Sequence, residues 1–273
     1  MNVAHFIELC RFFSSNGYSQ LKIMGGEPTI HNDFLEFVEI AQRYFDSINI
    51  FTNAINDQLT CIEPRSEDAI IYNFKFSKFL TKEKLLLSSP GDRALEVQIT
   101  SHIHQERLLS EIKRIVSLAP DRIKVYLTLD CTSEIFKERD IVIPIYEYIM
   151  QEAIKSNIIV GQDHLIPFCY LQGTNIPTAK CGAVCTLSCA GLIDSKYNIR
   201  FCNQFSDILG NIFQGDSTIT FEQYNKLLIE RFTEIHSKLR NGHCSACPYW
   251  NVICNGGCFM GRINDFPEKG VRI

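Results

Sequence analysis

The sequence lacks the features that would direct it to a membrane, a secretory route or nucleic acid. Its first residues, Met1 to His5, have no basic start and no uninterrupted apolar stretch, so they do not read as a signal peptide. No run approaches the roughly 18 apolar residues that a membrane-spanning helix needs. The net charge is -4 without a long basic run, which gives no electrostatic basis for binding nucleic acid or an anionic membrane. We therefore expect a cytoplasmic protein that binds neither nucleic acid nor a membrane.

Familiar catalytic signatures are missing as well. No Ser-His-Asp order and no phosphate-binding loop is recognisable. His102 and His104 stand at the end of an expected strand, but no acid or thiol nearby completes a metal site, which favours an ordinary loop pair. Asp130 and the pair Asp163-His164 also follow expected strands, where side chains often face the mouth of a parallel barrel.

Cysteine is the residue type that the sequence has in excess. Nine of the 12 cysteines lie between Cys169 and Cys258, and the earlier part holds only Cys10, Cys61 and Cys131. We expect these three isolated cysteines to be small buried hydrophobes. Because a chain of 273 residues without a signal peptide is expected to stay in a reducing compartment, the clustered thiols indicate metal binding rather than disulfides.

The densest group is the run Cys244-x2-Cys247-x6-Cys254-x3-Cys258, with two glycines between the last two thiols. Four thiols within fifteen residues are typical of a site for a soft metal. Thiolates suit zinc and iron–sulfur clusters equally well. From the residues alone, both remain open.

The first 165 residues alternate between short β-branched runs and amphipathic helices, which predicts a parallel sheet with helical crossovers. The character changes near Pro167, and we place a domain boundary between residues 167 and 168. Beyond it, 191–194 and 198–202 predict a hairpin that leads to Cys202, and Thr220 with Gln223 predicts a capping box at the start of a long helix. The elements expected before the boundary are helices over 3–15, from a cap at Asn32, around 108–116 and from Pro144 to about 156, and strands over 21–24, 48–52, 69–74, 95–100, 123–129 and 158–160.

The segment Met24-Gly25-Gly26-Glu27-Pro28-Thr29 lies where the first expected strand gives way to a loop. In parallel α/β folds, ligands bind at the carboxyl ends of strands. Two glycines there let the backbone approach a ligand closely, and a carboxylate suits a cation such as an ammonium group. An ordinary Gly-Gly loop with an exposed glutamate is the alternative.

This segment, together with a strand that ends in Thr52-Asn53, resembles the radical S-adenosylmethionine enzyme family, and the C-terminal cysteine array resembles the SPASM domain of some members. The resemblance covers about 17–55 and 180–262. It implies an α/β fold: a partial (β/α) barrel over 1–167 that lacks its first strand, followed by a small cysteine-rich α+β SPASM-like domain over 168–273. It also implies that S-adenosylmethionine binds at the top of the barrel, on Gly25, Gly26, Glu27, Pro28, Thr52 and Asn53.

By the same resemblance, the second domain holds one or two auxiliary four-iron four-sulfur clusters. One would take Cys189, Cys202 and Cys258, with Cys181 or Cys185 as the fourth ligand. The other would take Cys244, Cys247 and Cys254 with a cysteine further downstream, which this sequence does not contain. The segment Leu209 to Ile212 also matches the family pattern, whereas Tyr197 stands where the hairpin commonly has glycine.

The sequence departs from the family at its catalytic loop. The defining C-x3-C-x2-C motif should lie roughly forty residues before Gly25, but only 24 residues precede Gly25 and Cys10 is their only cysteine. A fragment of a longer product, a mis-assigned start and a degenerate homologue each explain this. We expect that the chain as given does not cleave S-adenosylmethionine, and its catalytic residues are not assigned.

The resemblance implies a maturase that modifies a peptide or protein substrate, with an electron donor or a partner maturase as a further partner. In that chemistry, a reduced cluster cleaves S-adenosylmethionine to a 5′-deoxyadenosyl radical, which abstracts a hydrogen atom from the substrate. Two other classes stay open: a catalytically dead scaffold that binds a peptide or partner enzyme, and a zinc-binding module.

Overall fold

The computed structural model describes residues 1–74, 92–118, 123–129, 138–162, 171, 173–175, 191–202, 207–215, 217–241, 244–250 and 254. The chain divides into two compact units. The first comprises Met1–Gln98, Ile103–Thr128 and Ile149–Gly161, and the second comprises Ile99–His102, Leu129–Tyr148 and Gln162–Ile273. The predicted boundary at 167/168 lies outside the described residues and stays a prediction.

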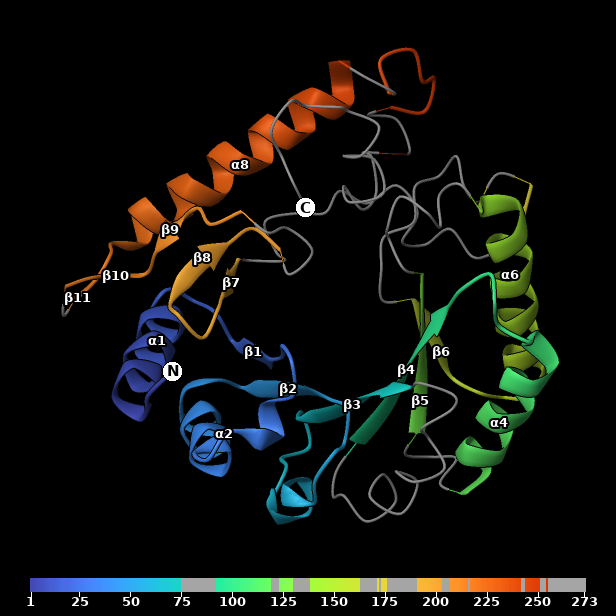
Figure 1. Cartoon of the computed structure of the whole chain (residues 1–273), viewed down its shortest axis with the longest axis horizontal. Coiled ribbons are helices and arrows are strands. Elements are labelled where there is room, and N and C mark those ends of the chain that lie inside the picture. The colour runs from blue at the N-terminus through green and yellow to red at the C-terminus, as the bar shows by residue number, and fades with distance from the viewer. Residues whose placement is uncertain are drawn as a thin grey trace. The chain divides into compact units, whose positions relative to one another are not determined.

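A six-stranded sheet forms the centre of the first unit, with its strands in sequence order (Figure 1). The pairings of the first four strands with one another are parallel. This is the parallel α/β sheet that the alternation of strands and helices predicts, and it is consistent with a partial (β/α) barrel. The strands are β1 (Gln20–Ile23), β2 (Ser47–Thr52), β3 (Ala69–Phe74), β4 (Asp92–Ile99), β5 (Ile123–Leu129) and β6 (Val160–Gln162).

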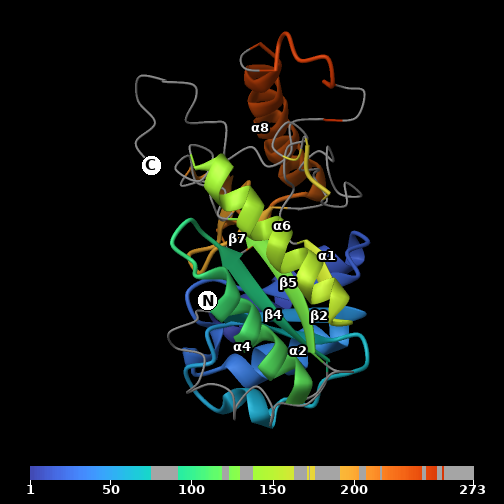
Figure 2. The same cartoon turned by 90° about the vertical axis from the view of Figure 1, so that its right-hand side faces the viewer.

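The two faces of this sheet differ in burial. Figure 1 shows α2 (Phe34–Tyr44) and α4 (Gln105–Leu118) on the same outer side of the sheet, and Figure 2 shows α4 running alongside β4 and β5. In β2, Ile48, Ile50 and Thr52 are at most 2% exposed, whereas the alternate residues Asn49 and Phe51 are half-buried. Since side chains alternate between faces along a strand, the helices cover one face, and Asn49 and Phe51 belong to the other.

Helices α1 (Val3–Ser15) and α2 pack against each other through aromatic rings. The ring centroids of Phe6 and Phe37 are 4.6 Å apart. The bounds of α1 are those predicted, and Asn2 caps it by accepting a hydrogen bond from the backbone N–H of His5 at 2.8 Å. The predicted cap of α2 is wrong by one residue, because Asp33 rather than Asn32 precedes its first turn.

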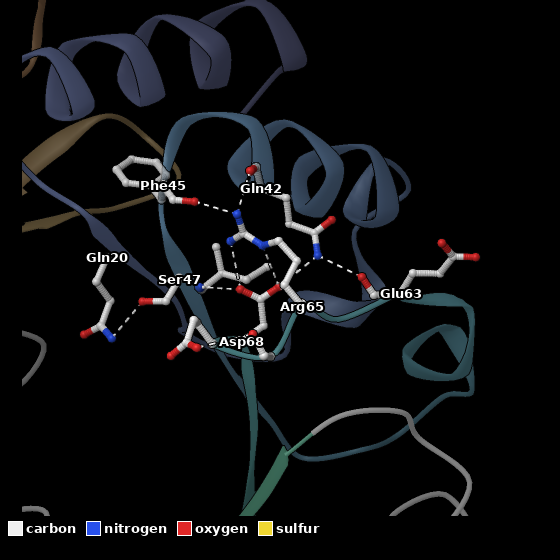
Figure 3. Close-up of polar contacts among 10 residues, drawn as sticks. Gln20, Gln42, Phe45, Ser47, Glu63, Arg65 and Asp68 are labelled. Carbon is white, nitrogen blue, oxygen red and sulfur yellow. Dashed lines mark hydrogen bonds and ion pairs between the residues drawn. The ribbon is translucent and has the colours of Figure 1, made fainter.

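An ion pair between the half-buried Arg65 and the buried Asp68 joins the end of α2 to the start of β3 (Figure 3). Arg65 donates to both carboxylate oxygens of Asp68, at 3.2 and 2.9 Å, and to the carbonyl oxygens of Gln42 and Phe45, both at 2.8 Å. Asp68 also accepts from the backbone N–H of Ile48 at 2.9 Å. The pair therefore satisfies carbonyl groups at the C-terminal end of α2, which have no partner within the helix.

Helix α6 (Arg139–Lys155) begins earlier than predicted. Pro144 lies inside this helix instead of opening it. The backbone N–H groups of Ile141 and Val142 bond to the carbonyl of Glu138, which starts the helix ahead of the proline. Because Pro144 is close to the N-terminal end, its missing N–H removes one intrahelical hydrogen bond, to the carbonyl of the exposed Asp140.

The predicted hairpin in the second unit is confirmed. β7 (Leu192–Ile193) and β8 (Asn198–Arg200) pair antiparallel, and β9 (Gly210–Asn211) adds a third strand that was not predicted. A carboxylate oxygen of Asp194 accepts from the backbone N–H of Lys196 and of Asn198 and holds the turn. Tyr197 adopts a φ of 65° there, which explains why glycine suits this position.

The long helix α8 (Phe221–Asn241) begins with the predicted capping box. The backbone N–H of Thr220 donates to Gln223 Oε1 at 2.8 Å, and the N–H of Gln223 donates to Thr220 Oγ1 at 3.2 Å. The apolar stripe is structural, since Tyr224, Leu228 and Ile235 are at most 2% exposed. Two short strands, β10 (Phe213–Gln214) and β11 (Ser217–Thr218), precede the helix. In the described part of the chain, no helix is long and apolar enough to cross a membrane.

Candidate functional site

The loop after β1 exposes its backbone at the carboxyl end of the sheet. Gly25 and Gly26 have φ values of +101° and +30°, and, apart from their chain neighbours, no described residue has an atom within 4 Å of the position that a Cβ would take on either. A side chain would be strained in this conformation, so glycine keeps the loop open for a close approach. The short 3-10 helix η1 (Pro28–Ile30) follows and places Pro28 in its first turn.

The carboxylate of Glu27 fastens this loop to the end of the neighbouring strand. Its Oε1 accepts hydrogen bonds at 2.6 Å from the hydroxyl of Thr29 and from the hydroxyl of Thr52. Its Oε2 accepts from the backbone N–H of Asn53. Thr29 and Thr52 are at most 1% exposed, so Glu27 is bound on the buried side of the loop by charge-assisted hydrogen bonds.

Asn53 extends the contact from the second strand to the first loop and the third strand. Its side-chain amide donates to the carbonyl of Gly26 at 3.0 Å, and its Oδ1 accepts from the amide of Asn73 in β3 at 3.2 Å. Asn56 donates to the carbonyl of Thr29 at 2.6 Å. Asn56 and Asn73 belong to this network although no motif in the sequence predicts them. The one signal in the sequence is that Asn73 is a polar residue within an otherwise apolar strand.

The structure thus brings the six predicted S-adenosylmethionine residues together through Glu27 and Asn53. It gives Glu27 a role that the sequence did not suggest, because the carboxylate already binds groups of the chain. Oε1 is engaged by Thr29 and Thr52, which leaves Oε2 as the oxygen better placed to take a further donor beside the N–H of Asn53. The predicted contact of Glu27 with an ammonium group stays a prediction.

The cysteine-rich segment forms turns around its described thiols. The backbone N–H of Cys247 bonds to the carbonyl of Cys244 at 3.1 Å, and the N–H of Cys254 bonds to the carbonyl of Tyr249 at 3.0 Å. Cys244 and Cys254 are buried and Cys247 is half-buried. Trp250, between them, packs on His236 of α8 with ring centroids 5.0 Å apart.

In the described part of the chain, no group of three or more His, Cys, Asp or Glu side chains could hold a metal ion. Cys202 follows β8 as predicted and is half-buried. The other predicted ligands, Cys181, Cys185, Cys189 and Cys258, lie outside the described residues. The ligand sets therefore stay predictions.

Of the three isolated cysteines, Cys10 is buried as predicted, at 2% exposure, and burial raises the pKa of its thiol to about 12. Cys61 is exposed, so that prediction is wrong. It ends the short helix η2 (Gln58–Cys61), which turns Leu59 into the core instead. Cys131 lies outside the described residues, as do Asp130, Asp163 and His164. His102 and His104 are exposed.

Known proteins resemble this chain in structure but not in sequence. No protein-family model matches it, and no curated protein matches it. A crystal structure of Streptococcus suis SuiB bound to S-adenosylmethionine matches with a TM-score of 0.61 and 14% identity, over 95% of this chain and 67% of SuiB. A second SuiB structure matches with the same score and identity, over 96% of this chain and 68% of SuiB. At this identity the likeness establishes the fold: the chain is folded like SuiB.

Proposed function

We propose that this chain is a radical S-adenosylmethionine-type protein that binds S-adenosylmethionine at the loop Gly25–Glu27 and acts on a peptide or protein. The observation that carries this is the bonding of Glu27 to Thr52 and Asn53, which holds two exposed glycines at the carboxyl ends of β1 and β2. SuiB, which has the same fold, has been solved with S-adenosylmethionine bound. The motif and the fold point to the same ligand.

The residues at this site fit such a ligand. The loop leaves open space at Gly25 and Gly26, so that backbone N–H and C=O groups can approach an amino acid-like group directly. The hydrogen bonds of Glu27 and Asn53 hold the loop in place before binding, which reduces the ordering that binding costs. S-adenosylmethionine supplies the radical when a reduced iron–sulfur cluster cleaves it.

Binding of S-adenosylmethionine is tested by calorimetry on the full chain and on Gly25→Ala. The matched control is Gly17→Ala, because Gly17 has a φ of +87° and equally open surroundings but ends α1. Both variants introduce a similar strain, so both should lose similar stability. We expect only Gly25→Ala to lose affinity, by about tenfold or more. Equal affinities of the two variants, or no binding by the unaltered chain, would refute the proposed site.

We also propose that the cysteines between Cys181 and Cys258 bind one or two four-iron four-sulfur clusters. The support is the density of thiols and the placement of Cys202 two residues after the end of the hairpin strand β8. Anaerobic reconstitution with iron and sulfide should give a brown protein, and Cys202→Ala and Cys258→Ala should each lose the same cluster. A colourless protein with stoichiometric zinc would favour the zinc-binding module instead.

Finally, we propose that residues 1–273 do not cleave S-adenosylmethionine unaided. Cys10 is the only thiol ahead of Gly25, and one thiol cannot hold a four-iron cluster, which needs three or four thiolates. The assay is formation of 5′-deoxyadenosine by the reconstituted, reduced chain, with a Glu27→Ala, Cys10→Ala variant as the background. Product above that background would contradict the proposal. Peptide binding without product is the behaviour expected of a scaffold or of a chain that needs a further cluster.

A further inference from the structure

We propose that Lys22 and Asn49 form a carboxylate-binding subsite on the face of the sheet opposite the helices, and that it selects peptides carrying Asp or Glu. The inference rests on the proposed function for its setting, since it assumes that the substrate is a peptide. It adds the chemistry by which that substrate is chosen.

Lys22 and Asn49 are direct register partners in adjacent parallel strands. Their chain neighbours Leu21 and Ile23 pair with Ile48 and Ile50, whose side chains are 0% and 2% exposed beneath the helices. Because side chains alternate along a strand and register partners point the same way, Lys22 and Asn49 both lie on the other face. Lys22 is exposed there and Asn49 is half-buried.

The two side chains offer a set of donors that suits an anion. The ammonium group of Lys22 carries three N–H donors, and the amide of Asn49 adds two. Within the ranges that the structure describes, neither side chain has a hydrogen-bond or ion-pair partner. Next to them, Gln20 donates to Ser47 at 3.2 Å, so the neighbouring polar pair on this face is already satisfied. Among the described residues, the donors of Lys22 and Asn49 are therefore available to an added group.

The surroundings fit a peptide side chain above this pair. On β3, the register partner of Asn49 is Ala69, whose small side chain leaves space beside the amide. One step nearer the carboxyl ends, Phe51 pairs with Ile71 and gives an apolar surface on the same face. Lys22 precedes Gly25 by three positions, or roughly 10 Å along an extended chain. A residue bound by Lys22 would therefore reach toward the Gly25–Glu27 loop.

A carboxylate is favoured over other anions by the modest charge of this face. One lysine and one amide complement a single carboxylate, whereas a polyanion such as nucleic acid requires a basic stripe. The net charge of -4 argues against the latter. The described acids of β4 at register positions of this face are Asp92 and Glu96, the partners of Ala69 and Asn73. Three strand spacings separate β4 from β1, roughly 14 Å, which is beyond the screening length at physiological salt.

The test uses three fluorescein-labelled pools of short peptides that carry Glu, Gln or Lys at a fixed central position among randomised uncharged residues. Fluorescence polarisation with the full chain measures their relative affinities. We expect the Glu pool to bind about fivefold more tightly than the Gln pool, as one partly exposed ion pair allows. Lys22→Met should abolish this preference, Asn49→Leu should weaken it, and Lys22→Arg should retain it.

The matched control is Lys226→Met, which removes an exposed lysine from α8. It should leave the Glu preference unchanged. Equal binding of the Glu and Gln pools by the unaltered chain, a preference that survives in Lys22→Met, or no binding of any pool would overturn the subsite. Calorimetry with S-adenosylmethionine separates this from the proposed function: Lys22→Met should bind it normally, and a chain that prefers Glu peptides without binding S-adenosylmethionine would refute the proposed function alone.

Discussion

The carboxylate of Glu27, in the loop after β1, and the hydroxyl of Thr52, the last residue of β2, lie 2.6 Å apart, although the two residues are 25 positions apart in sequence. This bond, with that to the backbone N–H of Asn53, converts two separate strand ends into one platform. The glycines of the loop need such a support, because two successive glycines are otherwise the least ordered part of a chain. The motif therefore combines an open backbone with a side chain that holds it still.

The coupling of Glu27 and Thr52 can be measured by a double-mutant cycle. Glu27→Gln replaces an acceptor by an amide that cannot accept at its nitrogen, and Thr52→Val removes the hydroxyl donor. Each single change should lower the free energy of unfolding by about 2 kcal/mol. Urea unfolding should show a double variant that is less destabilised than the sum of the two, because both remove the same bond.

The control for this cycle is Glu39→Gln on α2, where the side chain is 68% exposed. It should change the free energy of unfolding by less than about 0.5 kcal/mol. Strict additivity of Glu27→Gln and Thr52→Val would mean that the two side chains act independently.

Arg65 should matter more for stability than the exposed Arg43. Arg65→Met would leave the carboxylate of Asp68, which is 3% exposed, without its charged partner, and would free two carbonyl groups of α2. We expect a loss of about 3 kcal/mol in the free energy of unfolding. Arg43→Met, which breaks an exposed pair at 3.8 Å, should cost less than about 0.5 kcal/mol. Similar losses in the two variants would mean that the Arg65–Asp68 pair contributes no more than an exposed ion pair.

The same carboxylate should make stability depend on pH. Burial by itself raises the pKa of Asp68, but hydrogen bonds from the side chain and backbone of Arg65, from Gln42 and from Ile48 outweigh it, so the pKa lies below its ordinary value. The native state then binds this proton less readily than the unfolded state, where the pKa is about 3.9. The stabilisation is complete above that value and is lost as the pH falls through the native pKa.

Asp68→Asn isolates this contribution. The variant should be less stable than the parent near neutral pH, but its stability should fall less steeply as the pH drops below about 5. Urea midpoints over the acid range, measured for both proteins, give the comparison. Parallel curves would mean that Asp68 does not take part in the acid sensitivity.

The predictable parts of this chain are those that depend on neighbours in sequence. The capping box of Thr220 and Gln223 needs residues only three positions apart, and the stripe of α8 needs only the helical period. The turn at Tyr197 also depends only on nearby residues, since Asp194 accepts hydrogen bonds from Lys196 and Asn198. The sequence therefore predicted α8 and the hairpin correctly.

The contacts that the sequence does not predict depend on how the strands of the sheet pair. Asn73 meets Asn53 because β2 and β3 pair with these residues at the same level, and no local pattern specifies that register. The same pairing of β3 with β2 places Arg65, just before β3, beside the C-terminal end of α2. Proline favours the first turn of a helix, which predicts a helix start at Pro144. The helix begins earlier, because the carbonyl of Glu138 accepts the first hydrogen bonds.

The rates at which Cys10 and Cys61 react with an alkylating reagent test whether the first is buried and the second exposed. Burial raises the pKa of Cys10 to about 12, so almost none of it is thiolate at neutral pH, whereas Cys61 is exposed. Because the thiolate is the reactive form, iodoacetamide should modify Cys61 at least about tenfold faster than Cys10 in the native protein. Peptide mass spectrometry at timed intervals resolves the two sites. In urea both should react at similar rates, which controls for intrinsic differences. A native Cys10 that reacts as fast as Cys61 would place this thiol at the surface and contradict its burial on α1.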